Sequence, residues 1–371
     1  NQYVGTNLLA LVAADDFNAA VVDALRTRAA TLPAKRAKAL AALIDRQRPA
    51  LVGLQEVYSF TCYEETPNPY DRKGCEDPSI AGAFTDQLED SLQALGGRYV
   101  AAAQVVNMDL PGIPVTVEEG TIILIAVADR DVILAREDIP YENIDFTELQ
   151  SIVPPDYPKP CEWPSADGCN YAIVASADIT LPTPSGPVST TVYFERGFVG
   201  IDATVEGQPY RFVTTHLETR LEPDPLGRYF QTAQATELQQ TLQLLQSVDP
   251  RERTLVVGDF NSDPRDVEEI PGLRPPYQIF ADEYVDVWTM RPGARTGNGA
   301  PLVGYTCCQA EDLTNHRSEL YERIDLIFSL ATPTKVKDAR LLGESVADKT
   351  PPPGPRLWPS DHASVAARLQ Y

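Results

Sequence analysis

The sequence lacks several features that would decide its class at once. No apolar run reaches the roughly 18 to 20 residues of a membrane-spanning helix, so no membrane span is expected. The glycine-rich phosphate-binding loop, the G-x-S-x-G turn of serine hydrolases and the H-E-x-x-H helix of zinc proteases are all missing. These absences remove three common catalytic chemistries.

Positive charge is also scarce. The chain has 31 Lys and Arg against 53 Asp and Glu, a formal charge of −22, and only seven of the basic residues are lysine. This balance argues against a broad basic face that binds nucleic acid regardless of its sequence. It does not exclude a nuclease, because a divalent cation and a few local arginines can hold one scissile phosphate.

Cysteine is sparse and arranged in local pairs, none with the spacing of a zinc-binding array, so disulfides are the leading interpretation. The pairs are Cys62 with Cys75, Cys161 with Cys169, and Cys307 with Cys308. One cysteine paired elsewhere or left free remains an alternative. Disulfides predict a secreted protein, extracellular or periplasmic. A start at Asn1, without methionine or leader, suits a mature exported protein, although a truncated chain looks the same.

The most informative segment is Thr254 to Pro264, a short β-branched and apolar run that stops at Gly258. Asp259 and Asn261 follow, and because side chains alternate along an extended chain they are expected to point the same way. A carboxylate beside an amide suits a metal ion or a water molecule that attacks phosphorus. A strand followed by an ordinary Asp/Asn turn is the alternative, and this segment alone does not decide.

Other apolar runs end in, or contain, ionisable groups. Strand 50–54 leads to Glu56, strand 210–215 leads to His216, Asp325 lies inside the run 323–328, and Asp361 and His362 stand near the end of the chain. An ionisable group in such a position is costly unless it is paired or bound to metal. Several in one chain favour a single shared site.

These motifs resemble, in their order, the endonuclease/exonuclease/phosphatase superfamily, which includes pancreatic-type deoxyribonucleases, inositol polyphosphate 5-phosphatases and bacterial sphingomyelinases. They are Leu54-Gln55-Glu56, Thr215-His216-Leu217, Gly258-Asp259-Phe260-Asn261, Arg323-Ile324-Asp325 and Ser360-Asp361-His362. Thr6-Asn7-Leu8 resembles the asparagine of the family's first strand. The resemblance implies one α/β domain over residues 1–371, a four-layer sandwich of two mixed β-sheets flanked by helices.

The resemblance also implies a metal site. Glu56 is the expected main ligand, supported by Asn7, and Asp361 completes the cluster or holds a second ion. Oxygen ligands of this kind suit Mg²⁺, with Mn²⁺ or Ca²⁺ as alternatives. A capping or ion-paired glutamate is the simpler interpretation of Glu56.

Two of the three histidines belong to the implied catalytic set. His216 and His362 are expected to donate to phosphate oxygen or to protonate a leaving group. Each needs a carboxylate partner to stay charged. The resemblance pairs Asp325 with His362, whereas the partner of His216 stays open among Glu118, Glu119 and Asp109.

Three further residues complete the expected chemistry. Asp259 is the expected general base or water-orienting group, and Asn261 is expected to donate to a phosphate oxygen in the transition state. Arg196 is expected to contact the phosphate, with a surface ion pair to Glu195 as the alternative. The resemblance implies in-line attack of water on phosphorus without a covalent intermediate.

The pattern of apolar residues predicts the following elements. Helices are expected at 35–47 and 229–246, strands at 50–54, 120–128 and 254–258, and a hairpin from 198–205 and 210–215. Loop excursions are expected at about 58–80, 136–170 and 291–320.

Three functions were weighed. The first is a secreted, Mg²⁺-dependent phosphodiesterase or nuclease, expected to be a monomer. The second is a phospholipase C or sphingomyelinase-like enzyme, or an inositol-phosphate-type phosphatase, with aromatics of the 136–170 excursion touching lipid or a head group. Those aromatics are Tyr141, Phe146, Tyr157 and Trp163, and packing onto the body of the protein is their simpler use. The third is a non-catalytic binding protein on the same scaffold.

Overall fold

The structure is a computed structural model. It describes residues 1–371 except 13, 64–73, 118–120, 152, 154–160, 162, 166, 182–185, 187, 221–225 and 295–303.

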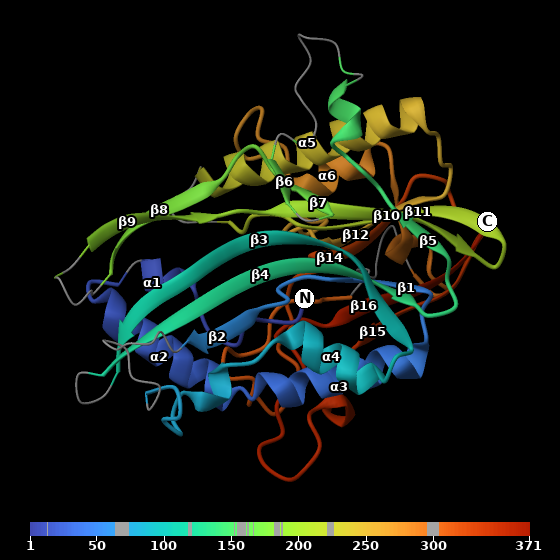
Figure 1. The fold of residues 1–371 in the computed structure, drawn as a ribbon. Helices are drawn as coiled ribbons and strands as arrows, with labels where there is room; N and C mark the ends of the chain where they lie inside the picture. The colour runs from blue at the N-terminus through green and yellow to red at the C-terminus, as the bar shows by residue number, and fades with distance from the viewer. Residues whose placement is uncertain are drawn as a thin grey trace.

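Two stacked β-sheets form the centre of the molecule, and helices cover both outer faces (Figure 1). Helices α2 (Phe17–Ala30), α3 (Pro33–Gln47) and α4 (Gln87–Leu95) lie on one side, and α5 (Leu226–Val248) and α6 (Pro276–Ala281) lie on the other. The expected α/β sandwich is therefore confirmed.

The smaller sheet has four strands built around β4. They are β1 (Leu51–Leu54), β2 (Ser59–Tyr63), β3 (Tyr99–Thr116) and β4 (Ile122–Arg136). Strand β4 pairs antiparallel with each of the other three. The predicted strand at 120–128 is thus the first part of a longer one, and the beginning of the predicted excursion at 58–80 is β2.

The larger sheet has eight strands in the order β13-β14-β12-β11-β10-β7-β6, with β5 also paired to β10. Strands β11 and β12 pair in parallel, connected through α5, and their other neighbours are antiparallel. The sheet is therefore mixed. Its strands are β5 (Tyr141–Asn143), β6 (Trp163–Ser165), β7 (Gly168–Asn170), β10 (Gly197–Val205), β11 (Gln208–His216), β12 (Thr254–Asp259), β13 (Val285–Asp286) and β14 (Asp325–Ser329).

Several shorter elements lie outside the two main sheets. Strand β8 (Ala175–Leu181) pairs with β9 (Val188–Phe194), and β15 (Lys335–Leu342) pairs with β16 (Ser364–Gln370). Helix α1 spans Leu9–Val12. Single 3₁₀ turns occur at Ala81–Ala83, Glu148–Ser151, Val287–Met290 and Val346–Asp348.

Apolar side chains fill each interface between layers. Residues such as Val105 and Val199 pack between the two sheets, Leu134 packs against the helices below the smaller sheet, and Leu238 packs α5 onto the larger sheet. Burial of this kind stabilises by about 25 cal/mol per Å² of apolar surface. Three packed interfaces leave the strand ends fixed in space.

Local sequence signals explain where the helices begin and end. Asp16 and Asp86 accept hydrogen bonds from the first turns of α2 and α4, as N-cap residues do. Helix α3 begins with Pro33 and ends at Arg48, which is left-handed and precedes Pro49. The predicted helices and strands all lie where the pattern placed them.

The cysteines and aromatics of the excursions also have clear positions. The three expected cysteine pairs lie at disulfide distance, with Cα–Cα separations of 6.0, 5.1 and 3.1 Å. Phe146 is buried against Phe198, whereas Tyr141 and Trp163 are exposed. Tyr157 lies outside the described residues. Among the described helices, none has the length and apolar character needed to cross a membrane.

Candidate active site

The candidate residues form a row across neighbouring strands of the larger sheet. Arg196 stands directly before β10, whose first residue Gly197 pairs with His216 at the end of β11. His216 in turn pairs with Asp259 at the end of β12, and Asp259 pairs with Asp325 at the start of β14. Strand register therefore places four side chains from distant parts of the sequence side by side.

Backbone shape at the end of β12 explains the Gly-Asp-Phe-Asn motif. Gly258 has a φ of 138°, and a Cβ there would lie 1.9 Å from the carbonyl oxygen of Thr215, so only glycine fits. Asn261 has a φ of 46°, so the strand alternation ends before it. Its backbone N–H donates to Asp259 Oδ1 at 2.9 Å and its Nδ2 donates to the Leu217 carbonyl at 2.8 Å. The expectation that Asp259 and Asn261 point the same way was wrong, because the chain turns between them.

His362 and Asp325 form a buried ion pair. His362 Nδ1 lies 2.8 Å from Asp325 Oδ2 and 3.7 Å from Asp259 Oδ2. Burial alone would lower the pKa of His362, but the carboxylates of Asp325 and Asp361 outweigh it and raise the pKa to about 10. His362 is therefore an imidazolium at neutral pH. The pairing implied by the family resemblance is present in the structure.

His216 has the opposite surroundings. Its Nδ1 lies 3.0 Å from Arg196 Nη1, and its Nε2 lies 3.8 Å from Asp259 Oδ2. A guanidinium only donates, so Nδ1 accepts and the ring proton is on Nε2. Burial, then the positive charge of Arg196, lowers the pKa of His216 well below its usual value. His216 is a neutral donor that faces Asp259.

Of the three carboxylates considered as partners of His216, the one that the structure describes, Asp109, is not beside the ring. Asp109 is exposed on β3, and Glu118 and Glu119 lie outside the described residues. Arginine occupies the partner position instead, which a search for nearby acids does not find.

Arg196 is a partly buried residue at the centre of a charge network. Its Nη2 donates to Glu218 at 3.3 Å, and its Nη1 lies 4.0 Å from Asp129. Burial would lower the pKa of Arg196, but these carboxylates hold it above its usual range. The alternative ion pair with Glu195 is not the one seen, and the guanidinium is directed at His216.

Glu56 accepts a hydrogen bond from an asparagine side chain, but the donor is Asn1 and not the expected Asn7. Asn1 Nδ2 donates to Glu56 Oε1 at 2.9 Å and to Asp259 Oδ2 at 3.2 Å. Asn7 is exposed, and its side chain accepts from Ala10 N at 3.3 Å in an ordinary helix-start contact. The placement of Asn7 in the site was wrong. Asn1 takes that position because the chain turns away before reaching residue 7.

Asp361 approaches the site from the loop before β16. Its pKa is raised to about 6, first by burial and then by the charge of Glu56, against the opposing charges of His362 and Arg36. Arg36 on α3 donates to the carbonyls of Gln2 at 2.8 Å and Pro359 at 3.3 Å, so it ties the first residues to this loop. Glu56 is thus close enough to Asp361 for its negative charge to raise the pKa of that carboxyl.

This donor set suits a hard divalent cation. Glu56, Asp361 and the side-chain oxygen of Asn1 offer only oxygen ligands, the type that Mg²⁺ and Mn²⁺ prefer. Burial, and then the negative charge of Glu56, raises the pKa of Asp361, and a bound cation would favour its ionised form. Asp259, Asp325 and His362 also have ligand atoms within 4.8 Å of one another, and there the imidazolium offsets the charge of one of the two carboxylates.

The segment Thr306–Gln309, here called the strap, binds both sides of the His362–Asp325 pair. Thr306 Oγ1 accepts from the N–H groups of Ile324 and Asp325 at 3.0 Å each. Its carbonyl accepts from Ala363 N at 2.7 Å, and Gln309 N donates to the Asp361 carbonyl at 2.8 Å. The strap therefore fixes the spacing between β14 and the Asp361–His362 loop.

Two buried acids of β4 were missed from the sequence. Asp129 lies near Arg196, and Asp131 lies beside Asn107 with no exposed surface. Burial raises the pKa of Asp129 to about 7, and burial with the nearby Asp129 charge raises the pKa of Asp131. Their signal was an acid within an apolar run, the same signal that marked Asp325.

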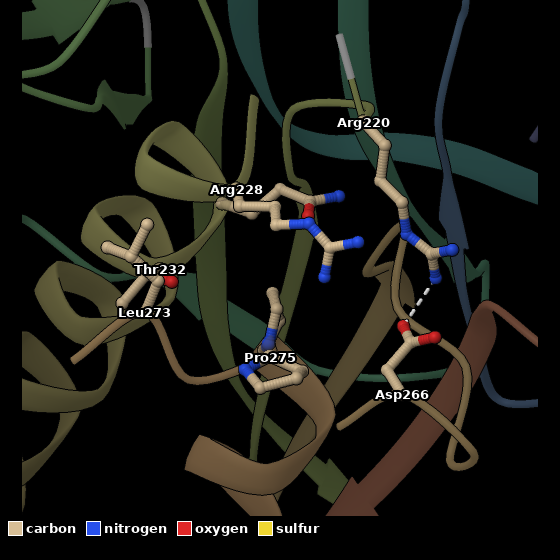
Figure 2. A pocket seen from close by; sticks show the side chains of 8 residues that line it. Arg220, Arg228, Thr232, Asp266, Leu273 and Pro275 are labelled. Carbon is tan, nitrogen blue, oxygen red and sulfur yellow. Dashed lines mark hydrogen bonds and ion pairs between the residues drawn. The ribbon is translucent and has the colours of Figure 1, made fainter. Parts of the chain in front are cut away.

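A small hollow lies beside the first turns of α5, lined by residues that include Arg220, Arg228 and Asp266 (Figure 2). Its lining residue Gln231 donates to the carbonyls of Glu218 and Asn261 at 2.9 Å each, which joins the hollow to the loops that follow β11 and β12. Arg220 and Arg228 extend into the same space, and Arg220 is paired with Asp266. Arg228 is paired with Glu269 at 2.7 Å.

Comparison with known proteins gives a family match. Residues 131–362 match the model of the Endonuclease/Exonuclease/phosphatase family, which is more than half of the chain's 371 residues. No curated protein sequence matches this chain.

Among solved structures, similar ones include a mannosyl-6-phosphatase of Bacteroides thetaiotaomicron, 16% identical, covering 96% of this chain and 96% of that chain with a TM-score of 0.49. A truncated TDP2 of Caenorhabditis elegans is 17% identical, covers 91% of each chain and has a TM-score of 0.45. TDP2 of D. rerio, solved with a single strand DNA product, is 16% identical over 91% of this chain and 92% of that one, with a TM-score of 0.43.

Proposed function

This chain belongs to the Endonuclease/Exonuclease/phosphatase family, and from that membership we propose that it is a divalent-metal-dependent phosphoester hydrolase, a secreted phosphodiesterase that cleaves nucleic acid. One observation carries the proposal. His216, Asp259 and Asp325 stand side by side at neighbouring strand ends, with His362 and Glu56 closing the cluster. A non-catalytic relative would be expected to have lost one of these polar groups.

The metal is held, in this proposal, by Glu56 and Asp361 with Asn1 beside them. When bound there, Mg²⁺ supplies positive charge to the phosphate oxygens and to the leaving oxygen. Arg36 keeps the two ligand-bearing segments together through its bonds to Gln2 and Pro359.

Asp259 is the proposed water-orienting base. Burial, then the neighbouring charge of Asp325, raises its pKa above that of an exposed aspartate, which makes it a stronger base. Its Oδ1 accepts from Asn261 N and its Oδ2 accepts from Asn1 Nδ2, and each carboxylate oxygen has a second lone pair with which to orient a water molecule. In-line attack on phosphorus then transfers the water proton toward Asp259.

The two histidines have separate proposed roles. Neutral His216 donates from Nε2 to a non-bridging phosphate oxygen, and charged His362 stabilises the negative charge that develops in the transition state. Arg196 acts through His216, because it holds the ring in the donating tautomer. Asn261 has a second amide hydrogen available for phosphate.

The preference for nucleic acid rests on the arginines of the adjacent hollow. Arg220 and Arg228 place two cations in the hollow beside the loops that follow β11 and β12, in a chain of charge −22. A guanidinium presents five N–H donors, a geometry that suits phosphate oxygens. A substrate with a second phosphate next to the scissile one would engage them, whereas a lone monoester would not.

The test is turnover of a substrate panel by the purified protein. Plasmid DNA, RNA, bis-p-nitrophenyl phosphate, p-nitrophenyl phosphate, sphingomyelin and an inositol phosphate are each assayed with and without Mg²⁺, Mn²⁺ or Ca²⁺. We expect cleavage of plasmid DNA, RNA and bis-p-nitrophenyl phosphate only with metal, and about 10²- to 10⁴-fold loss of turnover in Asp259→Asn and His362→Gln.

The matched control is His316→Gln, because His316 is exposed and away from the cluster. It should leave turnover unchanged. Metal-dependent cleavage of sphingomyelin or inositol phosphate without cleavage of nucleic acid would replace the substrate assignment and keep the chemistry. Diester cleavage that survives in folded Asp259→Asn would contradict the site itself.

A further inference from the structure

Two adjacent cysteines lie against the charged histidine of the site. The sulfur atoms of Cys307 and Cys308 and a ring nitrogen of His362 lie within 4.8 Å of one another. Cys307 is buried, while Cys308 keeps part of its surface accessible. The hydrolytic mechanism above uses neither sulfur.

Both cysteines belong to the strap that holds Asp325 and His362. The backbone of Cys307 pairs with Glu322, donating at 3.0 Å and accepting at 3.0 Å, directly before β14. On its other side the strap bonds Asp361 and Ala363. Anything bound at the two sulfurs therefore acts directly on the His362–Asp325 pair.

The ligand chemistry of this group depends on its redox state. As a disulfide, the sulfurs are poor ligands. Reduction by an external dithiol breaks the Cys307–Cys308 bond, adds two electrons and two protons to give two thiols, and leaves the dithiol as its own disulfide. Two thiolates and one imidazole, with a fourth position for water, are the soft set that Zn²⁺ takes.

We propose that reduction creates a second metal site, formed by Cys307, Cys308 and His362, that binds a thiophilic divalent cation of the Zn²⁺ type and turns the active site off. A cation bound to the ring of His362 would pull that ring toward the two sulfurs, so binding disturbs the contacts of His362 with Asp325 and Asp259. The oxygen ligands around Glu56 hold a different, hard cation, so the two sites select different metals.

The metal site is tested with Co²⁺, without reference to turnover. The protein is reduced with a water-soluble phosphine, which takes oxygen from water to become its oxide and adds no thiol ligand of its own. We expect about one equivalent of Co²⁺ to give a sulfur-to-cobalt charge-transfer band in the near ultraviolet, displaced by Zn²⁺. The oxidised protein should give no such band.

Matched double variants locate the site. Cys307→Ser/Cys308→Ser should lose the band after reduction, whereas Cys62→Ser/Cys75→Ser, which removes a different pair, should keep it. His362→Gln keeps both thiols and should bind Zn²⁺ at least about tenfold more weakly. No band in reduced wild type, or a band that persists without Cys307 and Cys308, would overturn the proposal.

The switch is tested by turnover of bis-p-nitrophenyl phosphate in excess Mg²⁺. One equivalent of Zn²⁺ should lower turnover at least about tenfold in the reduced protein, while the oxidised protein and reduced Cys307→Ser/Cys308→Ser each keep their own zinc-free rate. Equal inhibition of the oxidised protein, or loss on reduction without zinc, contradicts the switch. If the protein cleaves no diester at all, the cobalt band still decides the metal site.

Discussion

At the scale of single residues, His216 and His362 both lie within 3.8 Å of Asp259 Oδ2, yet one ring is neutral and the other is charged. Asp325 accepts a hydrogen bond from Nδ1 of His362 and raises the pKa of that ring, whereas burial and then the charge of Arg196 at Nδ1 lower the pKa of His216. Residue type alone does not determine this difference. The neighbour on one ring nitrogen does.

The first prediction concerns these charge states. In ¹⁵N spectra of the metal-free protein, His216 should be neutral with its proton on Nε2 at neutral pH, because burial and the charge of Arg196 hold its pKa well below the usual value. His362 should be an imidazolium at neutral pH and titrate near its pKa of about 10.

Replacing Arg196 distinguishes a positioning role from a structural one. Arg196→Met should release Nδ1 of His216, so that both ring tautomers appear. We expect kcat to fall about tenfold or more, which corresponds to an increase of ~1.4 kcal/mol in the activation free energy, with KM little changed. A single Nε2–H tautomer retained in Arg196→Met would contradict this role.

A second prediction concerns Asp361 and metal affinity. Its pKa of about 6 in the metal-free protein is above that of an ordinary aspartate, so the group is protonated below that pH and ionised above it. Because a proton and Mg²⁺ compete for the carboxylate, Mg²⁺ affinity should fall about tenfold per pH unit below 6 and level off above it.

Calorimetric Mg²⁺ titrations across this range measure the effect. Asp361→Asn should bind Mg²⁺ more weakly and lose the pH dependence. An unchanged acid-side slope in Asp361→Asn would place the competing proton on another group.

At the scale of elements, the first turns of α5 connect the two catalytic loops. Gln231 is buried and donates to the carbonyls of Glu218 and Asn261 at 2.9 Å each. A helix that packs on the larger sheet thereby also fixes the segments that follow His216 and Asp259.

The third prediction is that Gln231→Leu costs about 1–3 kcal/mol of unfolding free energy, since it leaves buried carbonyls without a donor. Turnover should fall as well, because both loops lose a shared contact. Gln243→Leu on the same helix is the control, since Gln243 is exposed and bonds only Glu283, and it should shift stability by about 0.5 kcal/mol or less. Denaturant unfolding and bis-p-nitrophenyl phosphate turnover check both variants.

Most helices and strands could be predicted from the sequence, because the spacing of apolar residues differs between a helix and a strand and shows which face is buried. Strand β12 and helix α5 follow directly from their apolar spacing. The strand-borne site candidates lie together because strand ends meet at a sheet edge.

The sequence did not show which side chains from distant parts of the chain contact one another. The contact of Arg196 with His216 depends on the register of β10 and β11, which apolar pattern does not specify. Asn1 and Asn7 are the same residue type six positions apart, and only the path of the chain after Tyr3 decides which one reaches Glu56. Asp129 was overlooked because it lies beyond the predicted end of its strand.

At the scale of the whole molecule, charge opposes the proposed substrate. A chain of charge −22 repels polyanions at long range, even where Arg220 and Arg228 attract them locally. Salt weakens the long-range repulsion before it weakens the local attraction. The Debye length falls from about 30 Å at an ionic strength of 0.01 M to about 8 Å at 0.15 M.

The fourth prediction is that kcat/KM for plasmid DNA rises over this salt range at fixed Mg²⁺, opposite to a nuclease with a basic face. Bis-p-nitrophenyl phosphate, with a single charge, should show little change. Initial rates at several salt concentrations measure both. A steep fall with salt for plasmid DNA would mean that a basic binding surface dominates instead.

The row from Arg196 to Asp325 crosses interior strands of the larger sheet, each bonded on both sides. Interior strands open only with the molecule as a whole, whereas surface loops open locally at lower cost. On slow heating, the amide protons of β11 and β12 should exchange through global unfolding. Irreversible loss of turnover should begin only at the temperature of global unfolding. The outer loops should become sensitive to proteases at lower temperatures.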